Sequence, residues 1–148
     1  WETRRFKWVM NLHPAYRGMG GVVTYIASDW QEVHVKLPLN LFTNNYVGTL
    51  FGGSLYGCID PLYMLMLIKI LGRDYIVWDK AATIQFKKPG SETLYARFHI
   101  PDDEIAAIKR DAAGGEALNR VYPVQLVDKA GTVHVHVDKT LYIKQKQV

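Results

Sequence analysis

Cysteine is nearly absent from the 148 residues, with Cys58 as the only one. A single cysteine cannot form a disulfide within the chain and fits a reducing compartment, so we expect a cytoplasmic protein. No cationic stretch followed by an apolar run and a small-residue cleavage site, the pattern of a signal peptide, occurs in these residues.

The sequence also lacks any long run of one charge. Eighteen Lys and Arg against 14 Asp and Glu give a net charge of +4, and the basic residues are spread along the chain. Without a basic block we expect no nucleic-acid partner, although a weakly basic domain can bind an anionic small molecule. At 49% hydrophobic residues, the chain is long enough to bury a core, so we expect a single domain over residues 1–148 with a lead-in segment at 1–17.

Residue types and turn signals predict the elements. The lead-in reads as a short helix ending near Pro14, and residues 38–46 read as a loop. Ser28 and Asp29 separate two β-rich runs, which predicts a hairpin. A charge pattern typical of a short helix spans residues 102–113, acidic at its start and basic at its end. The predicted strands cover residues 22–27, 32–37, 75–88, 93–100, 120–127 and 133–143.

Residues 54–71 form the most apolar stretch, rich in Leu and Met, which favours a helix ending at Gly72. Because it is apolar on nearly all sides, we expect it to be buried. Asp60 and Pro61 lie at its centre, and a central Asp costs about 3 kcal/mol in a membrane, so we expect a core helix and no membrane span. Pro61 cannot donate to the Gly57 carbonyl, so it predicts a kink or a free carbonyl there.

The order of elements is two strands, a long helix, two strands, a short helix and two strands. A strand-rich chain with one fully apolar helix buries that helix by wrapping the sheet around it. The sequence therefore predicts an α+β fold with a curved antiparallel sheet of about six strands. Such an open sheet leaves edge strands, which pairing with a second chain can cover.

A motif in residues 44–60 resembles the hotdog-fold thioesterases of the phenylacetate-pathway type. Those enzymes carry an Asn, then Gly-Thr, then His-Gly-Gly at the helix start, and an acid seven residues after the second Gly. The corresponding residues here are Asn44 or Asn45, Gly48, Thr49, Phe51, Gly52, Gly53 and Asp60. The chain is more similar still to an uncharacterised branch of that superfamily, in which Phe-Gly-Gly-Ser-Leu, a helical Asp-Pro and a Trp-Asp-Lys (Trp78, Asp79 and Lys80) recur.

The resemblance implies a hotdog fold and an acyl-thioester hydrolase that uses neither a metal nor another cofactor. Its substrate would be an acyl-coenzyme A or an acyl-carrier protein. The Gly53 amide, together with that of Gly52, would polarise the thioester carbonyl at a helix N-terminus. Asp60 would act as general base toward water or as a nucleophile. The His that precedes the two glycines in those enzymes is Phe51 here, so any role of that imidazole is missing.

Three polar residues before the helix are candidates for substrate binding. Asn44 or Asn45 would contact the thioester or act as a turn residue. Thr49 would cap the helix or contact substrate. Lys80 begins a strand in alternation with Ala82; if that face covers the helix, Lys80 points toward the site.

In that position Lys80 could pair with Asp60 or Asp79, meet an anionic substrate, or extend its ammonium to solvent.

Seven residues of helix rise about 10 Å, so one carbonyl cannot easily touch both Gly53 and Asp60 of the same helix. We therefore expect an obligate homodimer with two sites at its interface. A tetramer built from such dimers stays open.

Two other functions remain open on the sequence. One is a non-catalytic hotdog module that binds acyl groups or dimerises a fused domain, which the loss of the imidazole at Phe51 favours. The other is a hotdog hydratase or dehydratase, for which His99 is the candidate base. Cys58 has no His near it in sequence and is expected to be a buried core residue. His134 and His136 share a strand face without the spacing of a metal site.

Overall fold

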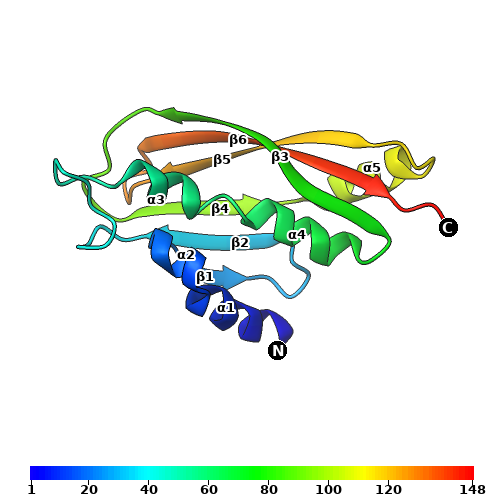
Figure 1. Cartoon of the computed structure of the whole chain (residues 1–148), viewed down its shortest axis with the longest axis horizontal. Helices are drawn as coiled ribbons and strands as arrows, with labels where there is room; N and C mark the ends of the chain where they lie inside the picture. Colours follow the sequence, from blue (N-terminus) through cyan, green and yellow to red (C-terminus); the bar gives the residue numbers. More distant parts are fainter.

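The computed structural model describes all 148 residues, and its centre is one six-stranded antiparallel sheet in the order β1-β2-β4-β5-β6-β3 (Figure 1). The strands are β1 (Val22–Ile26), β2 (Glu32–Leu37), β3 (Tyr75–Phe86), β4 (Leu94–His99), β5 (Leu118–Val127) and β6 (Val133–Gln145). The helices are α1 (Glu2–Leu12), α2 (Pro14–Met19), α3 (Gly52–Gly57), α4 (Leu62–Leu71) and α5 (Asp102–Ala112). All six predicted strands and the short helix before β5 are confirmed.

The alternation of β6 shows why the sheet has one buried face. Val135, Val137, Leu141 and Ile143 are fully buried and point to the core together with Lys139, while His136, Asp138, Thr140 and Tyr142 of the other face are partly exposed. Strand β3 pairs with β6 in register, with Ile84 opposite Val137, and supplies the last row of the same face. Because β3 pairs only with β6, its other side is an open edge of the sheet.

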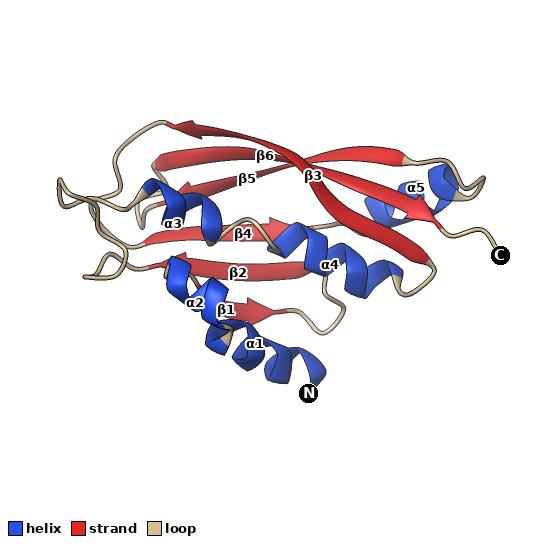
Figure 2. Cartoon of the chain, in the orientation of Figure 1, coloured by secondary structure: helices blue, strands red, loops and turns tan.

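The predicted central helix is interrupted. Helices α3 and α4 lie across the buried face of the sheet, and residues 58–61 form a turn between them (Figure 2). Pro61 cannot donate to the Gly57 carbonyl, which confirms the expected kink, and the break is wider than a simple bend. The Cys58 carbonyl accepts a hydrogen bond of 2.8 Å from the Tyr16 hydroxyl of α2. The long central helix is thus confirmed as two segments, α3 and α4, that meet at the turn of residues 58–61.

The segment Gly52–Leu71, taken as 20 residues with mean hydropathy 1.4, has the length and composition of a membrane span. Half of that stretch is buried inside the protein. The buried side chains Leu62, Met66 and Leu67 join the core that lies between α4 and the sheet. The segment thus behaves as a core helix with one partly open face, not as a helix buried on all sides.

The lead-in segment forms two helices, not one short helix. Pro14 ends the first helix and starts the second, where its fixed φ suits the first helical turn. Helix α1 packs on β1, and α2 packs on α3. The Asn11 side chain fixes α1 to β1, because its amide exchanges two hydrogen bonds with the Val23 backbone, at 2.8 and 2.9 Å.

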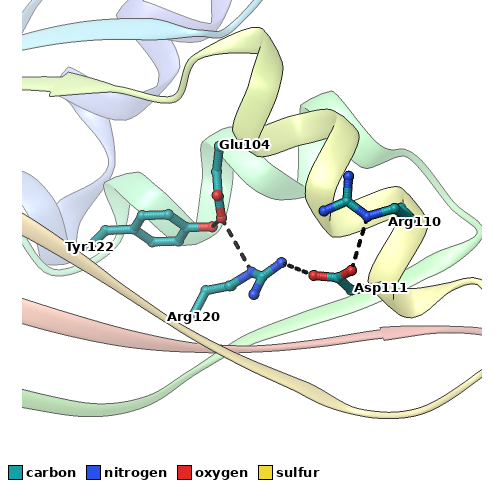
Figure 3. Close-up of polar contacts among 5 residues, drawn as sticks. All are labelled: Glu104, Arg110, Asp111, Arg120 and Tyr122. Carbon is teal, nitrogen blue, oxygen red and sulfur yellow. Dashed lines mark hydrogen bonds and ion pairs between the residues drawn. The ribbon is translucent and has the colours of Figure 1, made fainter.

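Helix α5 is fastened to the sheet by a polar network (Figure 3). Arg120 of β5 forms ion pairs with Asp111 at 2.7 Å and with Glu104 at 3.3 Å. The Tyr122 hydroxyl donates to the same Glu104 carboxylate at 2.8 Å. This network lies apart from the helix break and accounts for the position of α5.

Candidate functional site

A largely apolar pocket of about 600 Å³ lies where α1 and α2 face the broken helix. Its lining residues are Phe6, Val9, Met10, His13, Ala15, Tyr16, Met19, Gly53, Tyr56, Gly57, Asp60, Pro61 and Leu65. Two residues predicted to be catalytic, Gly53 and Asp60, line this same pocket. The break at 58–61 is what places a carboxylate beside an otherwise apolar cavity.

Asp60 is held by two donors. Its Oδ1 accepts hydrogen bonds of 2.8 Å from the Tyr56 hydroxyl and of 2.8 Å from the Lys139 ammonium. Lys139 also lies 2.9 Å from Asp79 Oδ1 and 3.1 Å from the Tyr56 hydroxyl. The four side chains therefore form one connected cluster, which joins the helix break to β3 and β6.

Lys139 is 1% exposed, and a buried ammonium needs nearby anions. Burial alone would lower its pKa, but the bonds to Asp60, Asp79 and Tyr56 outweigh burial and raise the pKa above its ordinary value. Lys139 is therefore a cation throughout the neutral range. Burial raises the pKa of Asp79, against the lowering effect of the Lys139 ammonium.

The second oxygen of Asp60 is free for chemistry. Oδ2 accepts no hydrogen bond from the chain, and the side chain is 46% exposed. The carboxylate also immediately precedes α4, whose N-terminus carries partial positive charge and favours an anion. An ionised carboxylate with one oxygen anchored and the other free can accept a proton from water or attack a carbonyl carbon.

The glycines of the motif begin α3. The amides of Gly52 and Gly53 donate to no acceptor within the chain, as expected for the first turn of a helix. Phe51 is the N-cap, and its ring lies against Gly53; a Cβ added to Gly53 would come 2.6 Å from Phe51 Cε1. The Phe in place of His thus leaves an aromatic ring beside these amides. Phe51 and Gly52 do not line the pocket.

The polar residues before the helix organise their own loop. Asn45 accepts hydrogen bonds from the backbone amides of Val47 and Thr49, and its side-chain amide donates to the Thr49 hydroxyl at 2.8 Å. Asn44 is exposed. Thr49 does not cap α3, because the N-cap is Phe51, two residues beyond it, and the Thr49 hydroxyl accepts a hydrogen bond from Asn45. None of these three side chains lines the pocket.

Lys80 does not point to the site. The register of β3 against β6 shifts between Asp79 and Ala81, so Lys80 lies in a bulge. This bulge puts Asp79 on the inner face, while Ala82 remains on it opposite Lys139. Lys80 is exposed, and its ammonium donates to the Asn119 side chain at 3.2 Å. Of the alternatives for Lys80, the ammonium extends to the surface and does not pair with Asp60 or Asp79; Lys139 makes those two ion pairs.

Sequence reasoning missed four residues at this site: Tyr16, Tyr56, His13 and Lys139. For Lys139 a signal existed, because it occupies the inward register of β6 between Val137 and Leu141. A lysine on an apolar face predicts a buried carboxylate partner. Tyr56 also had a local signal, because it lies four residues before Asp60 in the predicted helix and such pairs face each other. His13 and Tyr16 come from a segment whose position relative to Asp60 depends on the tertiary fold.

The other nucleophile and metal candidates lie elsewhere. Cys58 is fully buried, and burial raises the pKa of its thiol to about 12, so it is not a thiolate at neutral pH. His99 is exposed on the face of β4 opposite the core. His134 pairs with Asp128 at 2.9 Å and faces the Pro89 carbonyl, whereas His136 pairs with Asp138. The two imidazoles therefore serve separate contacts. Glu92 comes close enough to His134 and Asp128 for the three to meet a cation.

Comparison with solved structures identifies the architecture. A protein of unknown function from Pseudomonas aeruginosa, described as a probable thioesterase, superposes with a TM-score of 0.84 at 15% identity, over 97% of this chain and 96% of that one. A thioesterase from Haemophilus influenzae gives 0.69 at 12% identity, over 97% and 90%. Mouse thioesterase superfamily member 2 gives 0.68 at 16% identity, over 96% and 97%. The fold is the hotdog fold of these proteins, as predicted.

The family is shown by sequence. The model of the family described as "Domain of unknown function (DUF4442)" matches residues 2–143, nearly the whole chain, so the protein belongs to that family. No curated protein matches the sequence.

Proposed function

We propose that the protein is an acyl-thioester hydrolase whose base or nucleophile is Asp60. The observation that carries this proposal is the anchored carboxylate: Oδ1 is held by Tyr56 and Lys139, and Oδ2 is free beside an apolar pocket. The hotdog architecture supports it, since the similar structures include named thioesterases. A pocket of this kind accepts an apolar group and presents it to one charged atom.

In the proposed reaction, the Gly53 amide, with that of Gly52, polarises the thioester carbonyl. Asp60 takes a proton from water as the water oxygen attacks the carbonyl carbon. When the carbon–sulfur bond breaks, that proton passes to the leaving thiolate, so the products are a carboxylic acid, which ionises, and a thiol. Direct attack by Asp60 would instead form a mixed anhydride that water then hydrolyses. Lys139 acts as a positioning residue that holds Oδ1 of Asp60 in place.

The proposed substrate is an acyl-coenzyme A or an acyl-carrier protein, and the proposed active form is a homodimer with the site at its interface. Support for the dimer comes from the open edge of the 12-residue strand β3, which a second β3 can pair with. A second support is the exposed apolar loop before α3, where Leu41 and Phe42 are both 88% exposed. In a dimer, Gly53 of one protomer and Asp60 of its partner could act on one carbonyl.

The test is turnover by the wild-type protein. Acyl-coenzyme A and acyl-carrier-protein thioesters with short, medium, long and aromatic acyl groups would be incubated with the protein, and both the thiol and the acid quantified. Equimolar release of thiol and acid from at least one substrate is expected. No release from any thioester by folded dimer would remove the hydrolase proposal.

A non-catalytic binding module is the second candidate, and one observation favours it. Oδ1 of Asp60 is already bound to an ammonium and a hydroxyl, so this oxygen is engaged in contacts within the chain. Binding of acyl groups without turnover would support this candidate.

A further inference from the structure

The pocket beside Asp60 differs in charge from an ordinary fatty-acid site. Its lining side chains are apolar apart from His13, two tyrosines and Asp60, and no Lys or Arg is among them. Of the cations behind its wall, Lys69 lies 5.2 Å from the Phe6 ring centroid and pairs with Glu2. Lys139 is 1% exposed and is shared between two carboxylates, Asp60 and Asp79. When Asp60 and Asp79 are both ionised, the three groups carry a net charge of −1.

We infer that this pocket binds an acyl group whose carbonyl end is uncharged, as in a thioester or an amide, and rejects the free carboxylate of the same chain. The acyl identity rests on the proposed function, while the charge selection rests on the pocket itself. A fatty acid whose alkyl chain fills the pocket would bring its carboxylate close to that of Asp60, and two neighbouring negative charges repel each other. In a hydrolase, the same repulsion would expel the acid product after the carbon–sulfur bond has broken.

The roof of the pocket sets the shape of its ligand. Met10 and Met19 cover it from α1 and α2, and Leu65 closes it from α4. Unbranched, flexible side chains such as Met adapt to a flexible aliphatic chain. Met19 lies directly over Gly57: a Cβ there would come 2.5 Å from Met19 Cγ, so the glycine permits this close contact. The Tyr16–Cys58 hydrogen bond fixes α2 to the helix break at the same point.

The other charged and titratable groups around the pocket do not cancel this charge. His13 lines the pocket at the end of α1. Tyr16 and Tyr56 are uncharged, since burial raises the pKa of each above its ordinary value. Lys69 of α4 is paired with Glu2 at 3.2 Å, at the opposite end of α4 from Asp60. Asp60 therefore determines the sign of the potential in the pocket.

The experiment compares octanamide with octanoate, which have the same chain and nearly the same shape but differ in charge. Binding of each to the full chain is measured by titration calorimetry at about pH 8, well above the ordinary pKa of a carboxylic acid, so that octanoate is ionised. Octanamide is expected to bind at least about tenfold more tightly than octanoate. In Asp60→Asn the two ligands should differ by less than about threefold, through tighter binding of octanoate.

A second pair of variants locates the ligand. Met19→Trp fills the pocket from an exposed position and is expected to weaken octanamide binding about tenfold or more. Ile68→Trp places the same side chain on the exposed side of α4, outside the pocket, and should leave binding within about twofold.

Octanoate binding as tight as octanamide, no octanamide binding, or equal effects of the two Trp variants would overturn the inference. Selective octanamide binding by a protein that hydrolyses no thioester would support the inference and end the hydrolase proposal. Hydrolysis of a thioester by a protein that does not bind octanamide would support the hydrolase proposal and overturn the inference.

Discussion

Lys139 holds the candidate site together at the level of single residues. It lies 2.8 Å from Asp60 and 2.9 Å from Asp79, and it is almost fully buried. In Lys139→Met these two carboxylates would face each other without a cation. We expect a loss of about 3 kcal/mol in the free energy of unfolding, measured by urea denaturation. We also expect the acidic limb of the pH–rate profile to move to higher pH, because the carboxylate of Asp60 loses a stabilising charge.

Lys139→Arg keeps the positive charge and serves as the matched control. It should retain most of the stability and leave the acidic limb in place. A purely structural role for Lys139 would change stability without moving the pH–rate profile, and that result would contradict its role as a positioning residue.

Cys58 provides a second test at the residue scale. Its thiol is fully buried, and burial raises the pKa to about 12. We expect one equivalent of thiol to react with a disulfide reagent in denaturant and almost none in the native protein at neutral pH. Rapid labelling of the native protein would show that the helix break opens readily and that the Tyr16–Cys58 contact is not persistent.

At this scale the sequence predicted Asp60 and Gly53 as catalytic residues that act on one carbonyl from different subunits, and within one chain both line the same pocket. The sequence offered Lys80 as a cation that could pair with Asp60 or Asp79. Alternation with Ala82 placed Lys80 inward, but the bulge after Asp79 moves Lys80 outward and brings Asp79 in. No residue type in Trp78-Asp79-Lys80 announces a bulge, so the pairing partner on β6 was needed to find it. Lys139 could have been found, since it interrupts an apolar row.

Among the elements, the pairing of β2 with β4 contains a pH-sensitive contact. Arg97 and then His34, by hydrogen bonds to the Glu32 carboxylate, lower the pKa of Glu32 to about 2. A lowered pKa in the folded state stabilises the protein above the ordinary pKa of Glu and loses that effect as the pH falls.

We expect wild type to lose more stability than Glu32→Gln between about pH 5 and about pH 3, measured by urea denaturation. Equal losses in the two proteins would show that the contact between Glu32 and Arg97 contributes nothing to the pairing of β2 with β4.

The elements themselves could be predicted from the sequence, because each strand shows its own alternation or turn signal. The break in the central helix could be predicted only in part. Pro61 marked its position, but the extent of the turn depends on the Tyr16 hydroxyl, which takes the Cys58 carbonyl. That contact joins residues 42 apart in the chain, so it cannot be predicted from the local sequence around Pro61.

On the scale of the whole molecule, the sheet has two edge strands, β1 and β3, and helix α1 packs on β1. If two copies pair along β3 around a two-fold axis near its centre, Ala81 lies close to Ala81 of the partner. We expect sedimentation to give about twice the chain mass of 16.9 kDa. Ala81→Asp should give monomers, because like charges directly opposite each other on paired strands are unfavourable.

Val121→Asp is the control, since Val121 is an exposed residue of β5, away from the edge. Monomeric wild type, or dimers that persist in Ala81→Asp, would contradict pairing along β3. The fold and its open edge strands could be predicted from the order of the elements in the sequence. The pairing of two chains along one of these edges could not.

The central claim is that Asp60 performs thioester hydrolysis, and kcat/KM for Asp60→Asn tests it most directly. The assay uses the best acyl-thioester substrate of the wild type, with Asp74→Asn as control, because Asp74 is exposed and its carboxylate makes no hydrogen bond or ion pair in the chain. We predict a loss of about 100-fold or more for Asp60→Asn, the scale of a lost general base, and wild-type activity for Asp74→Asn. Full activity in folded Asp60→Asn would contradict the claim.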